Sequence, residues 1–270
     1  MKITFIGGGN MGSALISGLI RKGMACSEIA VVEPDTEKRT RIGEEYGVRT
    51  YGEAAIESMD CEVVVLAVKP QQLHEVASKL ADLLQNQLVV SIAAGIRATD
   101  LSAWLKGYSK IVRVMPNTPA QISKGISALY AMPDVEAKER AETVLSAVGS
   151  TIWLDEEEKM DAFTALCGSG PAYVFYFVEA MLDAAKRMGF NSAEARKMVL
   201  ETISGSVALA SESPDDAGTL RQKVTSRGGT TERALLEMEK HDVKLQITKA
   251  ILAAEERSRE MGIELGKTPC

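Results

Sequence analysis

Histidine is scarce in this sequence, with only two such residues among 270. His74 and His241 are widely separated, and neither has a second histidine nearby. A zinc centre with histidine ligands and a histidine-based catalytic triad are therefore not expected, and we predict no metal site. Any proton transfer must rely on hydroxyl groups, carboxylates, lysines or the substrate itself.

Cysteine is also sparse, and the four cysteines form no CxxC pair: Cys26, Cys61, Cys167 and Cys270. Such scattering is typical of reduced structural thiols in a cytosolic protein, and it disfavours the alternative of a metal or redox site.

An excess of positive charge is missing too, because 31 basic residues face 37 acidic ones and the formal net charge is −6. Such a chain has no general attraction for nucleic acid or anionic lipid. No apolar run approaches the roughly 20 residues of a membrane-spanning helix. The N-terminus also lacks the basic segment and apolar core of a signal peptide. We therefore expect a cytoplasmic protein without nucleic-acid or membrane partners.

Apolar residues are abundant, at 46% of the chain, which is enough for a large core and more than one domain. Up to residue 155, short apolar segments alternate with helix-compatible ones near 36–46, 71–84 and 97–105. The apolar segments are 2–6, 29–33, 62–68, 88–92, 110–115, 126–130 and 151–154. This alternation predicts an α/β fold, with a doubly wound Rossmann sheet over residues 1–155.

Residues 156–270 contain no convincing strand and predict an all-helical domain. The expected helices are 156–166, 171–188, 192–211, 231–240 and 242–261. The segment 172–181 is apolar around its whole circumference, so it must be buried in a core or in a subunit interface. About 110 residues are few for so much apolar surface. We therefore predict a dimerisation domain, with the chain interlocked with a partner.

The clearest motif is G-x-G-x-x-G at residues 7–12, which follows a strand and opens a helix. In a dinucleotide site Gly7 permits the tight turn, Gly9 lets the backbone approach the pyrophosphate, and Gly12 lets helix and strand pack closely. Asn10 and Met11 complete the loop at the helix N-terminus. A glycine turn without a ligand is the disfavoured alternative.

Glu33 ends the next strand, where a carboxylate would bind the ribose diol of NADH. The 2′-phosphate of NADPH would meet like charge at this place. The nearby Lys38, Arg39 and Arg41 could still accommodate that phosphate, so NADPH and NADH remain open alternatives.

Three further segments follow predicted strands, and ligands of open α/β sheets lie at these carboxyl ends. They are 67–70 (Ala67, Val68, Lys69, Pro70), 91–95 with Ala93, and 115–119 with Asn117. Lys69 could face the cofactor or be a solvated lysine before a helix-starting proline. Asn117 could bind a carboxamide or serve turn formation alone.

A second cluster, residues 224–231, combines two glycines with hydroxyl side chains just before a predicted helix. Such a loop exposes backbone N–H donors and suits a small anion such as a carboxylate. The equal alternative is an ordinary helix start capped by Thr230.

Taken in order, five motifs resemble those of pyrroline-5-carboxylate reductases, and the resemblance covers essentially the whole chain. The motifs are GGGNMG at 7–12, AVKP at 67–70, VMPNTP at 114–119, GSGPAY at 168–173 and VTSRGGTT at 224–231. Arg227 departs from the proline that many members carry, which affects only the rigidity of that loop. The resemblance implies reduction of 1-pyrroline-5-carboxylate to L-proline, the last step of proline biosynthesis, with NADPH or NADH as hydride donor.

The resemblance also implies roles for the loop residues. Backbone groups at Ser226, Gly228, Gly229 and Thr230 would hold the substrate carboxylate, and the Thr231 hydroxyl would contact the ring nitrogen as the catalytic contact. Family members are homodimers, some assembled into rings of dimers. Their active sites combine the loop of one chain with cofactor held largely by another.

Two other classes are weaker alternatives. A 3-hydroxyacid dehydrogenase would carry a lysine early on the helix after the linker, whereas 168–181 has none. A dinucleotide-binding regulatory protein without turnover would not need the glycine and hydroxyl loop.

Overall fold

The computed structural model describes residues 1–267, so Cys270 lies outside the described part of the chain. Contacts divide the chain into two compact units. The first unit comprises Met1–Ser169 and the segment from Ala254 onward, and the second comprises Gly170–Ala253.

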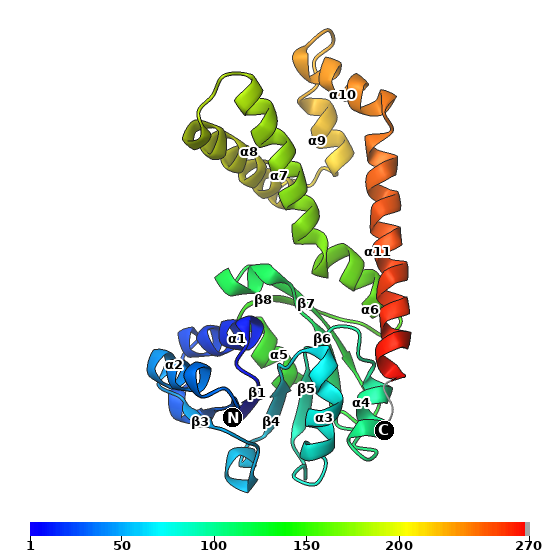
Figure 1. The fold of residues 1–270 in the computed structure, drawn as a ribbon. Helices are drawn as coiled ribbons and strands as arrows, with labels where there is room; N and C mark the ends of the chain where they lie inside the picture. The colour runs from blue at the N-terminus through cyan, green and yellow to red at the C-terminus, as the bar shows by residue number, and fades with distance from the viewer. Residues whose placement is uncertain (268–270) are drawn as a thin grey trace. The chain divides into compact units, whose positions relative to one another are not determined.

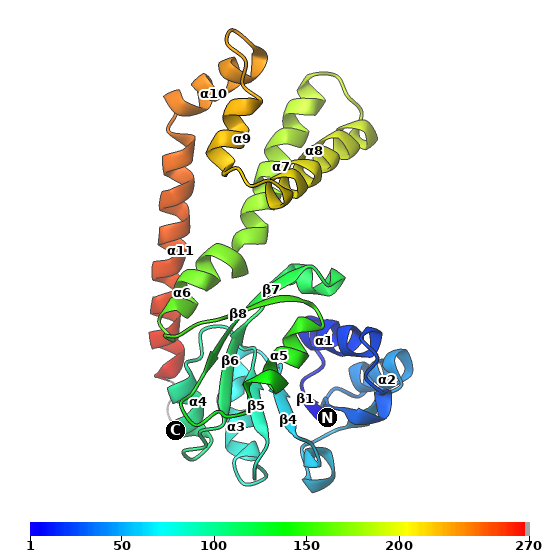
Figure 2. The ribbon, with the colours of Figure 1, turned by 180° about the vertical axis from the view of Figure 1, so that it is seen from behind.

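An eight-stranded sheet forms the centre of the first unit (Figures 1 and 2). Its strands are β1 (Ile3–Ile6), β2 (Ile29–Val32), β3 (Arg49–Tyr51), β4 (Val63–Leu66), β5 (Leu88–Ser91), β6 (Ile111–Met115), β7 (Gly125–Ala131) and β8 (Gly149–Trp153). The order is β3-β2-β1-β4-β5-β6-β7-β8. All neighbours are parallel except β6 and β7. The predicted doubly wound Rossmann sheet is thus confirmed, extended by two strands at one edge.

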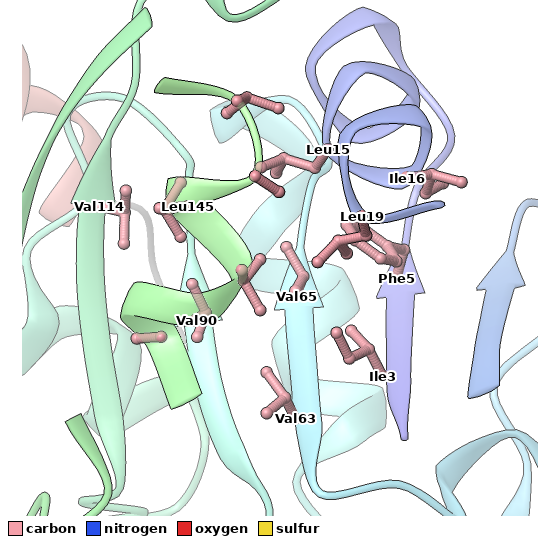
Figure 3. Close-up of a cluster of buried hydrophobic side chains, with 14 of the residues drawn as sticks. Ile3, Phe5, Leu15, Ile16, Leu19, Val63, Val65, Val90, Val114 and Leu145 are labelled. Atoms are coloured by element: carbon pink, nitrogen blue, oxygen red, sulfur yellow. The ribbon is translucent and has the colours of Figure 1, made fainter. Parts of the chain in front are cut away.

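Helices cover both faces of this sheet. They are α1 (Asn10–Arg21), α2 (Thr36–Tyr46), α3 (Pro70–Leu80), α4 (Ala98–Trp104) and α5 (Lys138–Ser146), with short 3₁₀ turns η1 (Cys26–Glu28), η2 (Ile56–Met59) and η3 (Thr118–Ile122). Side chains of α1 and α5 pack on one face in a fully buried cluster (Figure 3). Those of α3 and α4 pack on the other face. The central strands are buried on both faces, which explains their unbroken apolar sequences.

The sequence missed two elements of this unit. The strand β3 is only three residues long and half exposed, so it has no apolar pattern. The helix α5 was not predicted because few of its residues are apolar, although Ala141, Val144 and Leu145 are fully buried.

The segment after β8 is helical, as predicted. It begins with α6 (Lys159–Phe163) and a π-helical turn η4 (Thr164–Gly168), and continues as α7 (Gly170–Arg187), α8 (Ser192–Glu212), α9 (Ala217–Lys223), α10 (Thr230–Lys240) and α11 (Val243–Gly266). The predicted helices 156–166 and 171–188 are joined through this π turn rather than separated by a break, and α9 was not predicted.

The contact boundary differs from the predicted boundary between residues 155 and 156. Glu157 accepts hydrogen bonds from the Ala98 N–H at 2.7 Å and from Arg113 Nη1 at 2.8 Å. Ser258 Oγ donates to Asp161 Oδ1 at 2.7 Å. These contacts connect the segment before α6 to the sheet and connect α11 to α6. Removing one partner of a largely buried ion pair such as Arg113–Glu157 is costly. The sequence changes from alternating strands and helices to helices alone near Asp155, whereas the second compact unit begins only after Ser169.

Residues Lys159–Arg187 form a helical stretch of 29 residues whose most apolar window has a mean hydropathy of 1.2 and is 6% buried. Among the described residues it is the one stretch long and apolar enough to cross a membrane. The sequence-based expectation that no apolar run approaches membrane-spanning length missed this stretch, because glycine, serine and proline interrupt it at 168–171.

Candidate functional site

The glycine loop joins β1 to α1 in the geometry that a dinucleotide requires. Gly7 has φ +100°, and a Cβ there would lie 2.8 Å from the Ala67 carbonyl oxygen. A Cβ on Gly12 would lie 3.0 Å from the Gly7 oxygen, whereas one on Gly9 would meet nothing within 4 Å. The backbone is therefore packed at both ends of the loop and open in the middle, where a pyrophosphate would approach.

The N-terminus of α1 is available to an anion, because no side chain caps it at Gly9. Asn10 is exposed at the first position of the helix, while the Met11 side chain packs partly on the buried core. A cofactor phosphate would thus meet backbone N–H groups and the favourable end of the helix dipole.

Glu33 lies beside this loop with its carboxylate turned inward. Its Oε2 accepts from the Gly8 N–H at 3.0 Å, and its Oε1 accepts from the Asp35 N–H at 3.1 Å. The residue is only 8% exposed. The Glu33 carboxylate therefore already holds the glycine loop through the first of these hydrogen bonds. A ribose diol, as predicted from the sequence, would bind to its remaining lone pairs.

The basic residues proposed as alternatives have local partners. Arg39 Nη1 donates to the Glu33 carbonyl at 2.9 Å, and Lys38 Nζ lies 3.8 Å from Asp35 Oδ2. Both side chains stabilise the turn between β2 and α2, and Arg41 is exposed.

Glu33→Gln is expected to shift the ratio of kcat/KM values toward NADPH by about tenfold, the effect of one or two charge-assisted hydrogen bonds. The physical reason is the removal of negative charge beside the position of a 2′-phosphate. Kinetics with both cofactors measure the shift, and Glu37→Gln in the first turn of α2 is the control. An unchanged ratio would mean that the basic residues at 38–41, and not Glu33, determine the cofactor preference.

The end of β4 supplies the next predicted residues. Ala67 touches the glycine loop, as the Gly7 geometry shows, and Val68 is half-buried. Lys69 is exposed, precedes Pro70 at the start of α3, and makes no side-chain cap. Ala67, Val68 and Lys69 thus lie at the carboxyl end of β4, where the sequence predicts the cofactor.

Two further predicted residues follow the neighbouring strands. Ala93 is 3% exposed after β5. Asn117, after β6, accepts from the Ile126 N–H at 2.9 Å and donates to the Cys167 carbonyl at 3.1 Å. The parallel strands β1, β2, β4, β5 and β6 thus bring all predicted cofactor residues to one edge of the sheet.

The loop 224–231 lies in the helical unit, between α9 and α10. Gly228 has φ +73°, and Gly229, rather than Thr230, is the N-cap of α10. No side chain caps this helix, so the alternative that Thr230 serves as its N-cap is wrong. Ser226 and Thr230 are exposed and Thr231 is half-buried.

Glu232 is a residue of this loop region that the sequence did not single out. Its Oε2 accepts from the Gly228 N–H at 2.6 Å. A carboxylate already fits this N–H, so a substrate carboxylate bound here would take the place of Glu232. The sequence signal was available, since a glutamate at the third helical position commonly folds back on the preceding turn.

No group of three or more His, Cys, Asp or Glu residues that could hold a metal ion occurs among residues 1–267.

Two family profiles match the chain in succession. One is described as NADP oxidoreductase coenzyme F420-dependent and covers residues 2–95, and the other as pyrroline-5-carboxylate reductase dimerisation and covers 157–261. With the Rossmann sheet and its glycine loop, they define an NAD(P)H-dependent oxidoreductase with a helical dimerisation domain.

Full-length relatives specify the class further. The chain is 41% identical to a pyrroline-5-carboxylate reductase of Pseudomonas aeruginosa over 269 residues, 98% of each chain. The pyrroline-5-carboxylate reductase structure from Coxiella burnetii has a TM-score of 0.89 at 37% identity, covering 96% of this chain and 98% of that one. The Plasmodium falciparum pyrroline carboxylate reductase with NADP bound has a TM-score of 0.87 at 30% identity, covering 97% and 98%. The chain belongs to the pyrroline-5-carboxylate reductase family.

Proposed function

We propose that this protein reduces 1-pyrroline-5-carboxylate to L-proline with NADPH or NADH, and that the loop 224–231 binds the substrate. The observation that carries this assignment is the glycine-rich start of α10, which has no N-cap side chain and where the Gly228 N–H binds a carboxylate, that of Glu232. Family membership supports the reaction, and the loop offers backbone N–H groups to the one carboxylate that the substrate carries, which would displace Glu232.

The residues of the chain fit a reaction that needs orientation more than acid catalysis. A cyclic imine can arrive already protonated from water, which makes its carbon a better electrophile without a strong protein acid. The bound cofactor supplies the hydride. The loop would hold the substrate carboxylate through backbone N–H groups and keep the imine carbon in a near-attack position.

Thr231 is the proposed catalytic contact, with its hydroxyl at the ring nitrogen. The nitrogen loses its positive charge as an amine forms. A hydroxyl both donates and accepts, so it can follow this change without titrating. Ser226, Gly228, Gly229 and Thr230 are proposed to contact only the carboxylate.

We further propose that the protein is a homodimer, alone or in a ring of dimers, held by the helical unit. In that unit, large apolar side chains are exposed on every long helix. They include Val174, Phe175, Tyr176, Phe177, Val207, Leu209, Leu236, Leu245, Ile247 and Leu252. Between Gly170 and Ala253, the buried apolar side chains are Ala185, Ala195 and Val199. So small a core cannot stabilise a folded unit without a partner surface.

This arrangement accounts for the apolar stretch 159–187 without a membrane, since all of it lies within the dimerisation profile. The loop 224–231 of one chain would then meet the cofactor edge of another. A cytoplasmic location remains a prediction of the sequence.

Thr231→Ala is expected to lower kcat about tenfold or more, equivalent to about 1.4 kcal/mol of barrier, with little change in cofactor KM. Purified protein, synthetic pyrroline-5-carboxylate and either cofactor, followed by NAD(P)H absorbance, provide the measurement. Thr231→Ser should retain most of the activity.

Ser226→Ala is the comparison variant and should chiefly raise KM for the imine. If Thr231→Ala instead keeps the wild-type kcat and weakens only cofactor binding, Thr231 belongs to the cofactor site and the substrate is wrongly placed. A wild-type protein that binds NADPH but does not oxidise it with this imine would contradict the proposed function itself.

A further inference from the structure

Asn117 occupies the carboxyl edge of the sheet, yet both ends of its side-chain amide bind the protein. The residue is 9% exposed and follows β6 after one proline. Its Oδ1 accepts from the N–H of Ile126 at the start of β7, and its Nδ2 donates to the carbonyl of Cys167. The side chain therefore joins the ends of the neighbouring strands β6 and β7 to a segment 50 residues further along the chain.

The segment held by this bridge is the π turn η4, between α6 and α7. The Ser169 N–H donates to the Thr164 carbonyl at 2.8 Å, five residues back, which defines the wider turn. Insertions of this kind are rare in helices and occur frequently at functional sites. Asn117 supplies a side-chain donor to a carbonyl within that insertion.

A second contact places the same turn against the end of β6. A Cβ added to Gly168 would lie 2.7 Å from the Cε of Met115, the last residue of that strand. Gly168 thus lies against the tip of the Met115 side chain at the strand end. The Asn117 hydrogen bond fixes the turn, and the Met115 side chain packs beside it.

The order of the strands indicates which end of a dinucleotide this turn would meet. Glu33 follows β2 and the glycine loop follows β1, so the adenosine and pyrophosphate positions lie there. The sheet continues through β4 and β5 to β6. A dinucleotide extended along this edge therefore directs its nicotinamide toward the ends of β4, β5 and β6, where Asn117 and η4 lie.

We propose that Asn117 is a positioning residue of the reductase, which holds the π turn at the nicotinamide end of the site and does not itself bind the cofactor. The proposal rests on the proposed function. It replaces the interpretation of Asn117 as a partner of the carboxamide. An asparagine suits this task because it donates and accepts at once, whereas an aspartate would set a carboxylate oxygen against the Cys167 carbonyl.

The proposal predicts a separation of kcat from cofactor affinity. Asn117→Ala and Asn117→Asp should lower kcat about tenfold to 100-fold, because small displacements from the near-attack geometry have effects of this size. The dissociation constant of NADPH, titrated by its fluorescence, should stay within about twofold, since no cofactor contact is lost. Gln121→Ala removes an exposed amide from the neighbouring η3 and should change neither quantity.

A second measurement reports on the turn directly. Cys167 lies within η4, and burial raises the pKa of its thiol. In a variant background with the other three cysteines replaced by serine, labelling of Cys167 by a thiol reagent should become several-fold faster in Asn117→Ala. Gly168→Ala, which leaves Asn117 intact, should lower kcat by a smaller factor with unchanged NADPH affinity, because the flexible Met115 side chain can move aside. This variant keeps the test available if the Asn117 variants do not fold.

Three results would overturn the proposal: an unchanged kcat in an active enzyme, an unchanged labelling rate, or a loss of NADPH affinity. If the Asn117 variants lose affinity for NADPH but bind the 2′-phosphorylated ADP-ribose fragment as tightly as the wild type, Asn117 contacts the nicotinamide directly. Inactivity of the wild-type enzyme toward the imine would instead count against the proposed function. In that case labelling and NADPH titration would still test the bridge.

Discussion

Gly9→Val is expected to abolish dinucleotide binding while the protein stays folded and dimeric. The backbone at Gly9 is extended, with φ −71°, so valine is sterically allowed there. A Cβ at this position meets no protein atom within 4 Å. The branched side chain would therefore fill only the space proposed for the pyrophosphate. We expect the dissociation constant of NADPH to rise at least about 100-fold, or about 2.7 kcal/mol.

Fluorescence titration measures this loss, and circular dichroism with light scattering verifies the fold and assembly. Gly43→Ala in α2 is the control, because its Cβ would make only an ordinary contact with Thr50 at 3.6 Å. Gly8→Ala should behave differently and destabilise the fold, since its Cβ would lie 2.1 Å from Ile42 Cδ1. Undiminished NADPH affinity in Gly9→Val would refute the assignment of the loop.

Phe175→Glu is expected to dissociate the dimer and to remove activity with it. Phe175 is 61% exposed in the single chain and lies in the apolar run of α7. If the partner chain covers this surface, the glutamate must lose its hydration without a counter-charge. We expect the dimer dissociation constant to rise at least about 100-fold. The proposed active site takes residues from two chains, so the monomer should not turn over.

Light scattering at micromolar concentration, together with the imine assay, tests this expectation. Ile56→Glu is the matched control, because Ile56 is 79% exposed on the sheet unit and the same change there should affect neither assembly nor turnover. Phe175→Leu should preserve the dimer. A stable, fully active monomer in either wild type or Phe175→Glu would exclude the shared active site.

The sequence by itself determined the elements whose signal is local. The unbroken apolar strands predicted a parallel sheet with both faces covered, because side chains on either side of such strands must avoid water. The glycines at 7–12 predicted the cofactor loop, since a positive φ at Gly7 and close packing at Gly12 admit no larger residue. The apolar circumference of 172–181 predicted a helix that needs a partner surface.

Only the tertiary structure decided how side chains far apart in the sequence are paired. Asn117 meets Cys167 across 50 positions, and Asp161 meets Ser258 across 97. No periodicity or motif predicts such a contact, because the sequence pattern around a polar residue is the same whether its side chain binds a cofactor or a backbone carbonyl. Glu33 was predicted as a site residue from its place after β2. Its hydrogen bond with the Gly8 N–H could not be predicted, because nothing in the sequence pairs these two groups. Burial removes water as the alternative partner, so folding assigns each of these groups a partner within the protein.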